Sequence, residues 1–384
     1  PLDVAGSNGG GERRVKSRAY RLIRPHQVVE TEVEYELRDW EVVVEPTLGS
    51  ICHADLRYYT GNRRPDALRK KLPMALIHEG IGTVVRSGRR ELPAGRRVVI
   101  VPNIPGYVYR GIDPEHCCPI CRDGKGDNYC EHGRFLGSGV DGIAQHRLVI
   151  PAACVIPIPE EIPDDLAVLA ELFSVSYQAL SHLGDRLNTV KMAVFGDGPV
   201  GYLTAAAAYH IFGVGTDHLH VFGAIPEKLR QFDFAHRHLV QEFDFSSGGD
   251  YDVAVECTGG PFSESAINQA IDILKPGSQL ILMGVSEERV PVNTRDILEK
   301  GITVKGSSRS SARDFHPVLR AMCDPHCQAT LRKLLPDRWT AIRSAADFAR
   351  AMEEATQHRG WKKTILHFQW QTQGEEREHV TGRT

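Results

Sequence analysis

Two short segments in the first quarter of the chain carry side chains that could hold a metal ion. Cys52 lies in a glycine-containing loop, residues 49–55, and His78 is followed directly by Glu79. Zinc accepts thiolate, imidazole and carboxylate ligands together, and a catalytic zinc keeps one position open for water or a substrate oxygen. Singly, a cysteine is more often a small buried residue and a histidine a hydrogen-bonded one. Their joint occurrence predicts a catalytic zinc site at Cys52, His78 and Glu79, with Glu171 as a fourth candidate ligand.

Four cysteines lie close together between residues 117 and 130, and two of them have C-x-x-C spacing. Closed thiolate sites of this kind hold a structural zinc and fix a loop. The preference of zinc for thiolate favours Cys117 over Glu115 or His116 as the fourth ligand. The alternative is a set of thiols that bind no metal. The predicted structural zinc ligands are Cys117, Cys118, Cys121 and Cys130.

A glycine-rich loop later in the chain could bind a dinucleotide. The apolar segment 192–195 leads into Gly196-Asp-Gly-Pro-Val-Gly and then into an alanine-rich helix. Gly196 permits a tight turn, Gly198 lets a pyrophosphate approach the backbone, and Gly201 lets helix and strand pack closely. The alternative is a glycine-rich turn that binds no nucleotide. We assign cofactor binding to Gly196, Asp197, Gly198, Pro199, Val200, Gly201, Gly223, Lys228, Arg230, Cys257 and Gly284.

The end of the second strand of this unit bears on the choice between NAD and NADP. A site that prefers NAD usually has an acidic residue there, which binds the ribose 2′-hydroxyl. The strand end reads Val221-Phe-Gly, without a carboxylate, and Lys228 and Arg230 follow. A 2′-phosphate would meet less repulsion, so we expect NADP(H) rather than NAD(H). The alternative is that these cations are only solvated.

The elements that must position these residues belong to two segments with different patterns of apolar residues. Between residues 19 and 163, short apolar runs broken by Gly and Pro predict a β-rich unit that holds the zinc ligands. From 164 to 310, helical patterns alternate with apolar strands and predict a six-stranded, doubly wound parallel sheet. Residues 311–370 are expected to return to the first unit. Residues 1–18 and 371–384 lack periodicity and are expected to be flexible.

Composition excludes several other classes of protein. The 384 residues are 41% apolar and 25% charged, and 46 basic residues face 49 acidic ones, for a net charge of −3. We therefore expect no nucleic-acid or membrane partner. No apolar stretch is long enough to span a bilayer and no secretion signal is evident, so we expect a cytoplasmic protein. Nine cysteines in a chain of this length favour metal binding over a disulfide framework.

In this order the motifs resemble the zinc-dependent medium-chain dehydrogenase/reductase superfamily, over about residues 20–368. Within it, longer strings are similar to the ribulose-5-phosphate reductases of teichoic acid precursor synthesis. They include SICHADLRYYTG at 50–61, KLPMALIHEG at 71–80, SAINQ at 265–269 and GSSRS at 306–310. The resemblance implies a GroES-like catalytic domain beside a Rossmann sheet. It also implies NADPH at the Gly196 loop and catalytic zinc at Cys52, His78, Glu79 and Glu171. The complete cysteine lobe is more similar to the broader polyol and alcohol dehydrogenases.

The resemblance also implies a reaction, the reduction of D-ribulose 5-phosphate to D-ribitol 5-phosphate or of a related pentose or cyclitol phosphate. Many alcohol dehydrogenases relay the proton through a hydroxyl two residues past the zinc cysteine, but Ala54 stands there. A zinc-bound water held by Glu171, or the phenol of Tyr58, is the expected route. Tyr58 could equally be a packed core residue.

Cations in the resembling segments could bind the substrate phosphate, chiefly Arg57 and Arg309, with Arg295 as a further candidate. Each could instead pair with a surface carboxylate. The alternative functions are a zinc polyol or alcohol dehydrogenase that uses an unphosphorylated substrate with NAD(H), and a cofactor-assisted isomerase or epimerase. By analogy with such folds we expect a homodimer or homotetramer.

Overall fold

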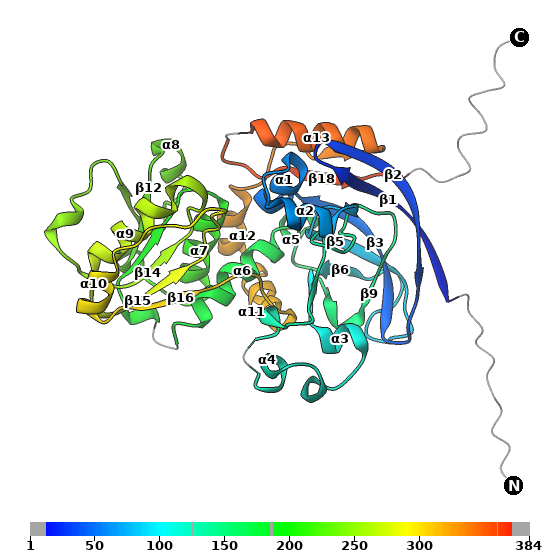
Figure 1. Cartoon of the computed structure of the whole chain (residues 1–384), viewed down its shortest axis with the longest axis horizontal. Coiled ribbons are helices and arrows are strands. Elements are labelled where there is room, and N and C mark those ends of the chain that lie inside the picture. The colour runs from blue at the N-terminus through cyan, green and yellow to red at the C-terminus, as the bar shows by residue number, and fades with distance from the viewer. Residues whose placement is uncertain (1–12, 125, 185–186, 359, 371–384) are drawn as a thin grey trace, which may run out of the picture.

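Two large sheets organise the chain, one antiparallel in its main part and one parallel throughout, and they lie on opposite sides of the molecule (Figure 1). The computed structural model describes residues 13–124, 126–184, 187–358 and 360–370. The predicted fold class, a β-rich unit beside a doubly wound parallel sheet, is confirmed. The expected flexibility of residues 1–12 and 371–384 lies outside the described residues.

The β-rich unit is built around a seven-stranded sheet in the order β10-β6-β5-β3-β18-β17, with β9 also paired to β3. Its central strand β3 is buried along most of its length, which explains the apolar run near its start. The strands are β3 (Glu41–Ser50), β5 (Glu79–Arg86), β6 (Arg97–Ile100), β9 (Leu148–Pro151), β10 (Val155–Pro157), β17 (Thr340–Ile342) and β18 (Ile365–Phe368).

A three-stranded sheet, β2-β1-β4, covers one side of this unit. It comprises β1 (Arg14–Arg24), β2 (Gln27–Glu36) and β4 (Met74–Ala75), and a small two-stranded sheet joins β7 (Asn103–Ile104) to β8 (Arg134–Phe135). The expectation that residues 14–18 belong to an unstructured terminus was wrong, because they form the start of β1 and pair with β2. Val15 and Ser17 are buried while their charged neighbours face outward, so the charges masked a strand alternation.

The parallel sheet has six strands in the order β13-β12-β11-β14-β15-β16. Its three central strands are fully or largely buried, as expected for a sheet covered on both faces. Strand β13 was not among the segments predicted, because its sequence His-Arg-His-Leu is polar and half exposed. The strands are β11 (Met192–Phe195), β12 (Leu219–Gly223), β13 (His236–Leu239), β14 (Tyr251–Glu256), β15 (Leu274–Leu282) and β16 (Thr303–Gly306).

Helices connect and cover both sheets. Helices α5 (Asp164–Ala167) and α6 (Ala170–Ser181) follow one another closely, and α6 packs on α7 and α11 between the two units (Figure 1). The remaining α-helices are α1 (His53–Thr60), α2 (Pro65–Lys71), α3 (Gly106–Arg110), α4 (Pro119–Arg122), α7 (Pro199–His210), α8 (Pro226–Leu229), α9 (Ser263–Ile273), α10 (Thr294–Lys300), α11 (Ala312–Met322), α12 (Pro325–Arg332) and α13 (Ala345–Gln357).

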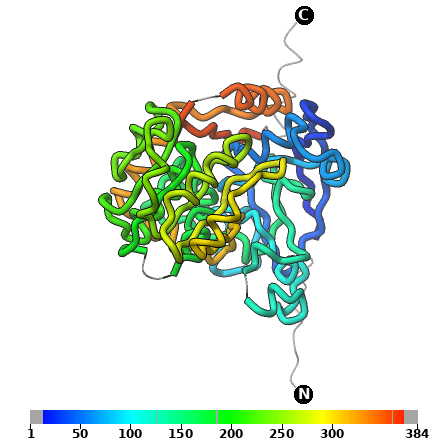
Figure 2. Tube along the Cα trace, turned by 60° about the vertical axis from the view of Figure 1, so that its left-hand side comes forward, coloured from blue at the N-terminus to red at the C-terminus, as the bar shows by residue number. Residues whose placement is uncertain are grey.

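The segment after the parallel sheet runs back to the β-rich unit. Strand β18 pairs antiparallel with β3, and α13 packs against α1 and β2. Figure 2 shows this orange and red segment crossing to the blue strands of the N-terminal part. Within the described ranges, no helix is both long and apolar enough to cross a membrane.

Candidate active site

Cys52, His78 and Glu79 converge in the β-rich unit. Cys52 is the N-cap of α1, Glu79 begins β5, and one potential ligand atom from each of the three residues lies within 4.8 Å of the others. Glu79 is 0% exposed, and its Oε1 has no hydrogen-bond partner among the described residues. A buried carboxylate oxygen without a partner, beside a thiol and an imidazole, suits a bound zinc ion.

Asp55 orients this group of residues. Its carboxylate accepts hydrogen bonds from the backbone N–H of Cys52 at 3.0 Å and of Ile77 at 3.1 Å, and it lies 3.2 Å from Nδ1 of His78. Burial disfavours the charged imidazole, but Asp55 raises the pKa of His78 well above its ordinary value. With Nδ1 engaged by Asp55, Nε2 is the nitrogen left for a metal. This role of Asp55 was not predicted, although its capping position, three residues after Cys52, was a usable signal in the sequence.

The backbone just before His78 adopts an uncommon conformation. Ile77 has φ 72°, which is sterically unfavourable for a β-branched residue and costs on the order of 1–3 kcal/mol. Its N–H is held by Asp55, and its carbonyl accepts from the N–H of Ile143 at 2.7 Å. A Cβ at Gly142 would lie 2.3 Å from the Ile77 carbonyl oxygen, so only glycine lets the two backbones approach this closely. The surrounding loop therefore holds the strained segment in place.

Lys363 reaches this site from the far end of the chain. Its Nζ lies 2.8 Å from Oε2 of Glu79 and donates to the carbonyl of Ile51 at 3.0 Å. Burial disfavours the ammonium, but the neighbouring Glu79 raises the pKa of Lys363. The ion pair fixes the carboxylate of Glu79 and compensates its charge. No local motif marks Lys363, so its role was not predicted from the sequence.

Glu171 lies in the first turn of α6 and is buried, but it is not part of the group of three ligand atoms within 4.8 Å. Burial above all, and then Glu79, raise the pKa of Glu171 to about 8, against the opposite effect of His78. The structure thus places Glu171 within electrostatic reach of the site. Its role as a zinc ligand or as a holder of water stays a prediction.

The four cysteines of the loop are brought together. Sγ of Cys118 lies 3.6 Å from Cys121 and 3.9 Å from Cys130, and Cys117 lies 3.7 Å from Cys130. All four are free thiols. Four sulfurs at about 2.3 Å from a tetrahedral zinc are separated by about 3.8 Å, so these spacings fit a structural zinc.

The cysteine lobe, residues 117–130, contacts the segment that follows β16. Asn128 donates from Nδ2 to the carbonyl of Ser308 at 2.9 Å, and the hydroxyl of Tyr129 accepts from the N–H of Ser308 at 3.2 Å. Arg309 follows with φ 62°, and its guanidinium lies 4.9 Å from the ring centre of Phe135, which in turn packs on His78. The lobe therefore supports the backbone that carries Arg309.

The glycine loop joins β11 to α7 as the sequence analysis expected. Gly198 is the N-cap of α7, and a Cβ there would meet nothing within 4 Å. A Cβ at Gly201 would lie 2.0 Å from the carbonyl oxygen of Gly196, so helix and strand can pack this closely only without a side chain. The open space at Gly198, beside free N–H groups at a helix N-terminus, fits a pyrophosphate.

Asp197 turns toward the end of β12. Its Oδ2 accepts from the N–H groups of Ala224 and Ile225, both at 2.8 Å, and a Cβ at Gly223 would lie 2.7 Å from Cβ of Asp197. Arg230 pairs with Glu227 on the surface at 3.3 Å, and Lys228 is half-buried. Of the two cations assigned to a 2′-phosphate, Arg230 is thus already engaged by a carboxylate.

Glu256 ties together two loops at the carboxyl edge of the parallel sheet. This fully buried carboxylate accepts from the N–H groups of Thr258 at 2.8 Å and of Gly259 and Gly284 at 3.1 Å. A Cβ at Gly284 would lie 2.5 Å from both carboxylate oxygens. Cys257, assigned to the cofactor site, is packed against Gly196, where a Cβ would meet its carbonyl carbon at 3.1 Å. Gly284 and Cys257 therefore lie at the carboxyl edge of the sheet, whereas the role of Glu256 was not predicted from the sequence.

Two family descriptions match this chain. The alcohol dehydrogenase GroES-like domain matches residues 38–160, and the zinc-binding dehydrogenase family matches residues 221–324. The chain is 35% identical over 356 residues to ribulose-5-phosphate reductase 1 of Staphylococcus aureus, with 91% of this chain and 98% of the relative covered. The chain belongs to the zinc-dependent medium-chain dehydrogenase/reductase superfamily. The resemblance stated from short motifs is confirmed at that level.

Further relatives agree with this assignment. The ribulose-5-phosphate reductase of Bacillus spizizenii is 35% identical over 357 residues, which cover 92% of this chain and 99% of the relative. The crystal structure of S. aureus TarJ in complex with NADPH has a TM-score of 0.77 at 32% identity, covering 92% of this chain and 100% of TarJ. L-idonate 5-dehydrogenase of Escherichia coli, with a TM-score of 0.78 at 23% identity, shares the fold. The protein is accordingly a zinc-dependent, NAD(P)-dependent dehydrogenase.

In this dehydrogenase, cations gather around Tyr58. Arg63 lies over its ring at 4.5 Å, and Lys71 donates to its hydroxyl at 2.9 Å. Arg57 and Arg63 share one carboxylate, that of Glu287 from the other unit, at 3.7 and 3.3 Å. Tyr58 itself is 2% exposed. Arg57 and Tyr58 were predicted as site residues from the sequence, whereas Arg63 and Lys71 were not.

Two of the predicted phosphate-binding arginines differ in their surroundings. Arg309 is exposed and forms no ion pair with any described residue of the dehydrogenase. Arg295 is 82% exposed on α10 and pairs with Glu299 at 2.8 Å. Arg309 therefore remains a candidate ligand for an anion, while Arg295 has the surroundings of an ordinary surface residue.

Proposed function

We propose that this dehydrogenase reduces a sugar phosphate with NADPH, and that the substrate is D-ribulose 5-phosphate, reduced to D-ribitol 5-phosphate, or a related pentose or cyclitol phosphate. Relatives at 35% identity that span almost the whole chain carry the name ribulose-5-phosphate reductase, and S. aureus TarJ binds NADPH. These likenesses support the proposal.

The observation that carries it is the excess of cations near the candidate zinc site. Arg57, Arg63 and Lys71 surround Tyr58, and Glu287 is the one carboxylate that pairs with the first two in the described part of the chain. Nε of both arginines is buried without a hydrogen-bond partner among the described residues. Buried N–H groups without an acceptor are costly, and a phosphate group supplies the acceptors that these two Nε atoms lack.

The geometry supports the following proposed roles. Cys52, His78 and Glu79 hold the catalytic zinc, while Asp55 and Lys363 fix the orientation of His78 and Glu79. When bound, zinc polarises the substrate carbonyl and the nicotinamide supplies a hydride to its carbon. Arg309, Arg57 and Arg63 bind the substrate phosphate. This contact sets the distance between the substrate carbonyl and the ligand group, which consists of Cys52, His78 and Glu79.

The preference for NADP(H) rests on the loop after β12. Gly223 leaves no carboxylate side chain at the strand end, and Lys228 is half-buried nearby. Oδ2 of Asp197 accepts hydrogen bonds from two backbone N–H groups, which partly neutralises the charge of this carboxylate. These features support a 2′-phosphate, and Arg230 contributes less because it already pairs with Glu227.

The test compares D-ribulose 5-phosphate with D-ribulose while NADPH consumption is followed at several substrate concentrations. We expect kcat/KM to be at least about 100-fold higher for the phosphate, since several charge-assisted hydrogen bonds at about 1.5–3 kcal/mol each distinguish the two. Arg309→Met should raise KM for the phosphate by about 10-fold or more and leave KM for D-ribulose unchanged. Arg295→Met is the matched control. Equal use of both sugars would instead support a polyol dehydrogenase.

A further inference from the structure

The hydroxyl of Tyr58 belongs to a closed set of three polar side chains from separate segments. Tyr58 lies on α1, Lys71 ends α2, and Ser138 is in the loop after β8. Lys71 donates from Nζ to the Tyr58 hydroxyl at 2.9 Å and to Oγ of Ser138 at 2.8 Å, and the two hydroxyls lie 3.0 Å apart. Every pair in the set is therefore within hydrogen-bond distance.

This arrangement is complementary to an ionised phenol. A phenolate oxygen accepts hydrogen bonds only, and both Lys71 and Ser138 can donate to it. We propose that Lys71 and Ser138 position Tyr58 as the catalytic acid that protonates the substrate oxygen during carbonyl reduction. The inference deepens the proposed function and rests on it. It decides between the two proton routes that the sequence left open, the phenol of Tyr58 and a water held by Glu171.

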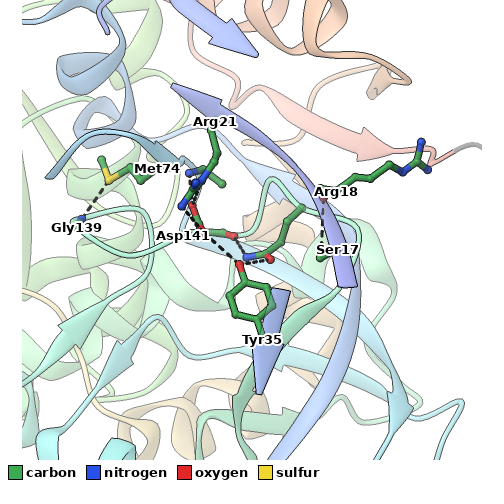
Figure 3. Close-up of polar contacts among 10 residues, drawn as sticks. Ser17, Arg18, Arg21, Tyr35, Met74, Gly139 and Asp141 are labelled. Atoms are coloured by element: carbon green, nitrogen blue, oxygen red, sulfur yellow. Dashed lines mark hydrogen bonds and ion pairs between the residues drawn. The ribbon is translucent and has the colours of Figure 1, made fainter. Parts of the chain in front are cut away.

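The loop that carries Ser138 is firmly anchored. Asp141 accepts two hydrogen bonds from Arg21 on β1, both at 2.9 Å, and one from the N–H of Ala75 on β4 at 2.8 Å (Figure 3). Tyr35 on β2 donates to the same carboxylate at 3.2 Å, and the N–H of Gly139 contacts the sulfur of Met74 at 3.1 Å. Ser138 is thus held on a frame of three strands, which a positioning residue requires.

The charges around Tyr58 favour the release of its proton. Burial alone would raise the pKa of the phenol, but the hydrogen bonds from Lys71 and Ser138 and the nearby Arg63 lower it below its usual value. Arg57 on the same helix and Arg309 after β16 also act on Tyr58 electrostatically. Glu287 is the carboxylate facing this group, and two arginines share it.

Tyr58 lies on α1, the helix that begins at the candidate zinc ligand Cys52. Helical side chains tilt toward the helix N-terminus, and Cys52 is the N-cap of α1. Arg57, the residue before Tyr58, interacts electrostatically with both Tyr58 and Cys52. Ser138 follows Phe135, which packs on His78 with ring centres 5.2 Å apart. Tyr58 therefore shares a helix with the ligand Cys52, and Ser138 lies three residues after Phe135, which contacts the ligand His78.

The proposed step transfers one hydride and one proton to the carbonyl group. A hydride from the reduced nicotinamide forms a C–H bond with the carbonyl carbon, and the π electrons of the C=O bond move to oxygen. That oxygen takes the phenolic proton of Tyr58, which gives a secondary alcohol, an oxidised nicotinamide and a phenolate. Lys71 and Ser138 stabilise the phenolate until a proton from solvent restores the phenol. In the oxidative direction the phenolate accepts the alcohol proton.

The test uses Tyr58→Phe, Lys71→Met and Ser138→Ala in the zinc-loaded protein, with neighbours as matched controls. Tyr59→Phe removes a buried hydroxyl that instead donates to Ala349, and Lys70→Met removes an exposed lysine. We expect Tyr58→Phe to lower kcat by about 100-fold or more with NADPH binding, measured by fluorescence, unchanged. Lys71→Met should lower kcat by about 10-fold, and Ser138→Ala less.

The pH profile separates a catalytic role from a structural one. Reduction needs the protonated phenol, so the rate falls as the pH rises through the pKa of Tyr58. Loss of Lys71 raises that pKa, and the alkaline limb of kcat for Lys71→Met should move upward by about one pH unit or more. An unmoved limb, or a Tyr58→Phe variant that keeps more than about a tenth of wild-type kcat, would overturn the inference.

Two further measurements keep this test apart from that of the proposed function. All variants are assayed with D-ribulose 5-phosphate and with D-ribulose. If the wild type does not prefer the phosphate, the role of Tyr58 as proton donor can still be tested with the free sugar. If the wild type reduces neither sugar, ultraviolet difference titration of wild type against Tyr58→Phe still measures ionisation of the phenol. An ionisation that does not shift to higher pH in Lys71→Met would then refute the coupling between the two residues.

Discussion

The replacement of Asp55 by asparagine tests how the candidate zinc site is held. Asp55 is 1% exposed and accepts from two backbone N–H groups and the imidazole of His78. Asparagine can replace one carboxylate oxygen, but its NH₂ group then faces a donor, so one charge-assisted hydrogen bond is lost and a buried donor is left unpaired. Together these effects cost about 2–5 kcal/mol of unfolding free energy.

The same change should weaken zinc binding about 10–100-fold, because His78 loses the anionic group that fixes its ring. Unfolding in urea measures the first effect, and competition with a chromogenic chelator measures the second. Asp66→Asn, an exposed aspartate paired with Arg69, is the matched control. A loss of less than about 1 kcal/mol together with unchanged zinc retention would refute the assignment of Asp55 as the residue that orients His78.

Three other perturbations have defined outcomes. Gly142→Ala places a Cβ 2.3 Å from the Ile77 carbonyl oxygen, so it should lower the melting temperature and the zinc content, whereas Gly88→Ala, with nothing within 4 Å, should change neither. Burial, followed by the neighbouring imidazole on β13, lowers the pKa of His220 to about 4. The unfolded chain, with a pKa of about 6.5, takes up this proton first, so stability is lost as the pH falls from about 6.5 toward 4; His220→Gln should flatten that dependence in urea titrations. Cys121→Ser should remove one zinc per chain by metal analysis and leave the lobe open to proteolysis; unchanged stoichiometry would contradict a structural zinc there.

A functional site could be predicted from the sequence when its residues lay close together in one segment. The glycine loop and the His78–Glu79 pair are local, so their elements and their place in the fold followed from short strings. Strand β13 and residues 14–18 were missed because polar side chains on an exposed face hide the strand alternation.

The contacts of Tyr58 with Lys71 and Ser138 could not be predicted from the sequence, because they join distant segments. Lys71 and Ser138 are 13 and 80 residues away from it in the chain, and no spacing rule relates such positions. The same holds for Glu287, which reaches Arg63 from the other unit across 224 residues. Such contacts depend on tertiary packing, which periodicity and propensity do not encode.

The ion pair between Lys363 and Glu79 also sets an order of events during synthesis on the ribosome. Lys363 is 312 residues beyond Ile51, whose carbonyl it also binds. At about 5–20 residues per second, a nascent chain exposes Cys52, His78 and Glu79 for roughly 15–60 s before Lys363 is made. During this interval Glu79 lacks its buried cation and β18 is not yet paired with β3. Cys52, His78 and Glu79 therefore reach their final arrangement only after the parallel sheet has been synthesised.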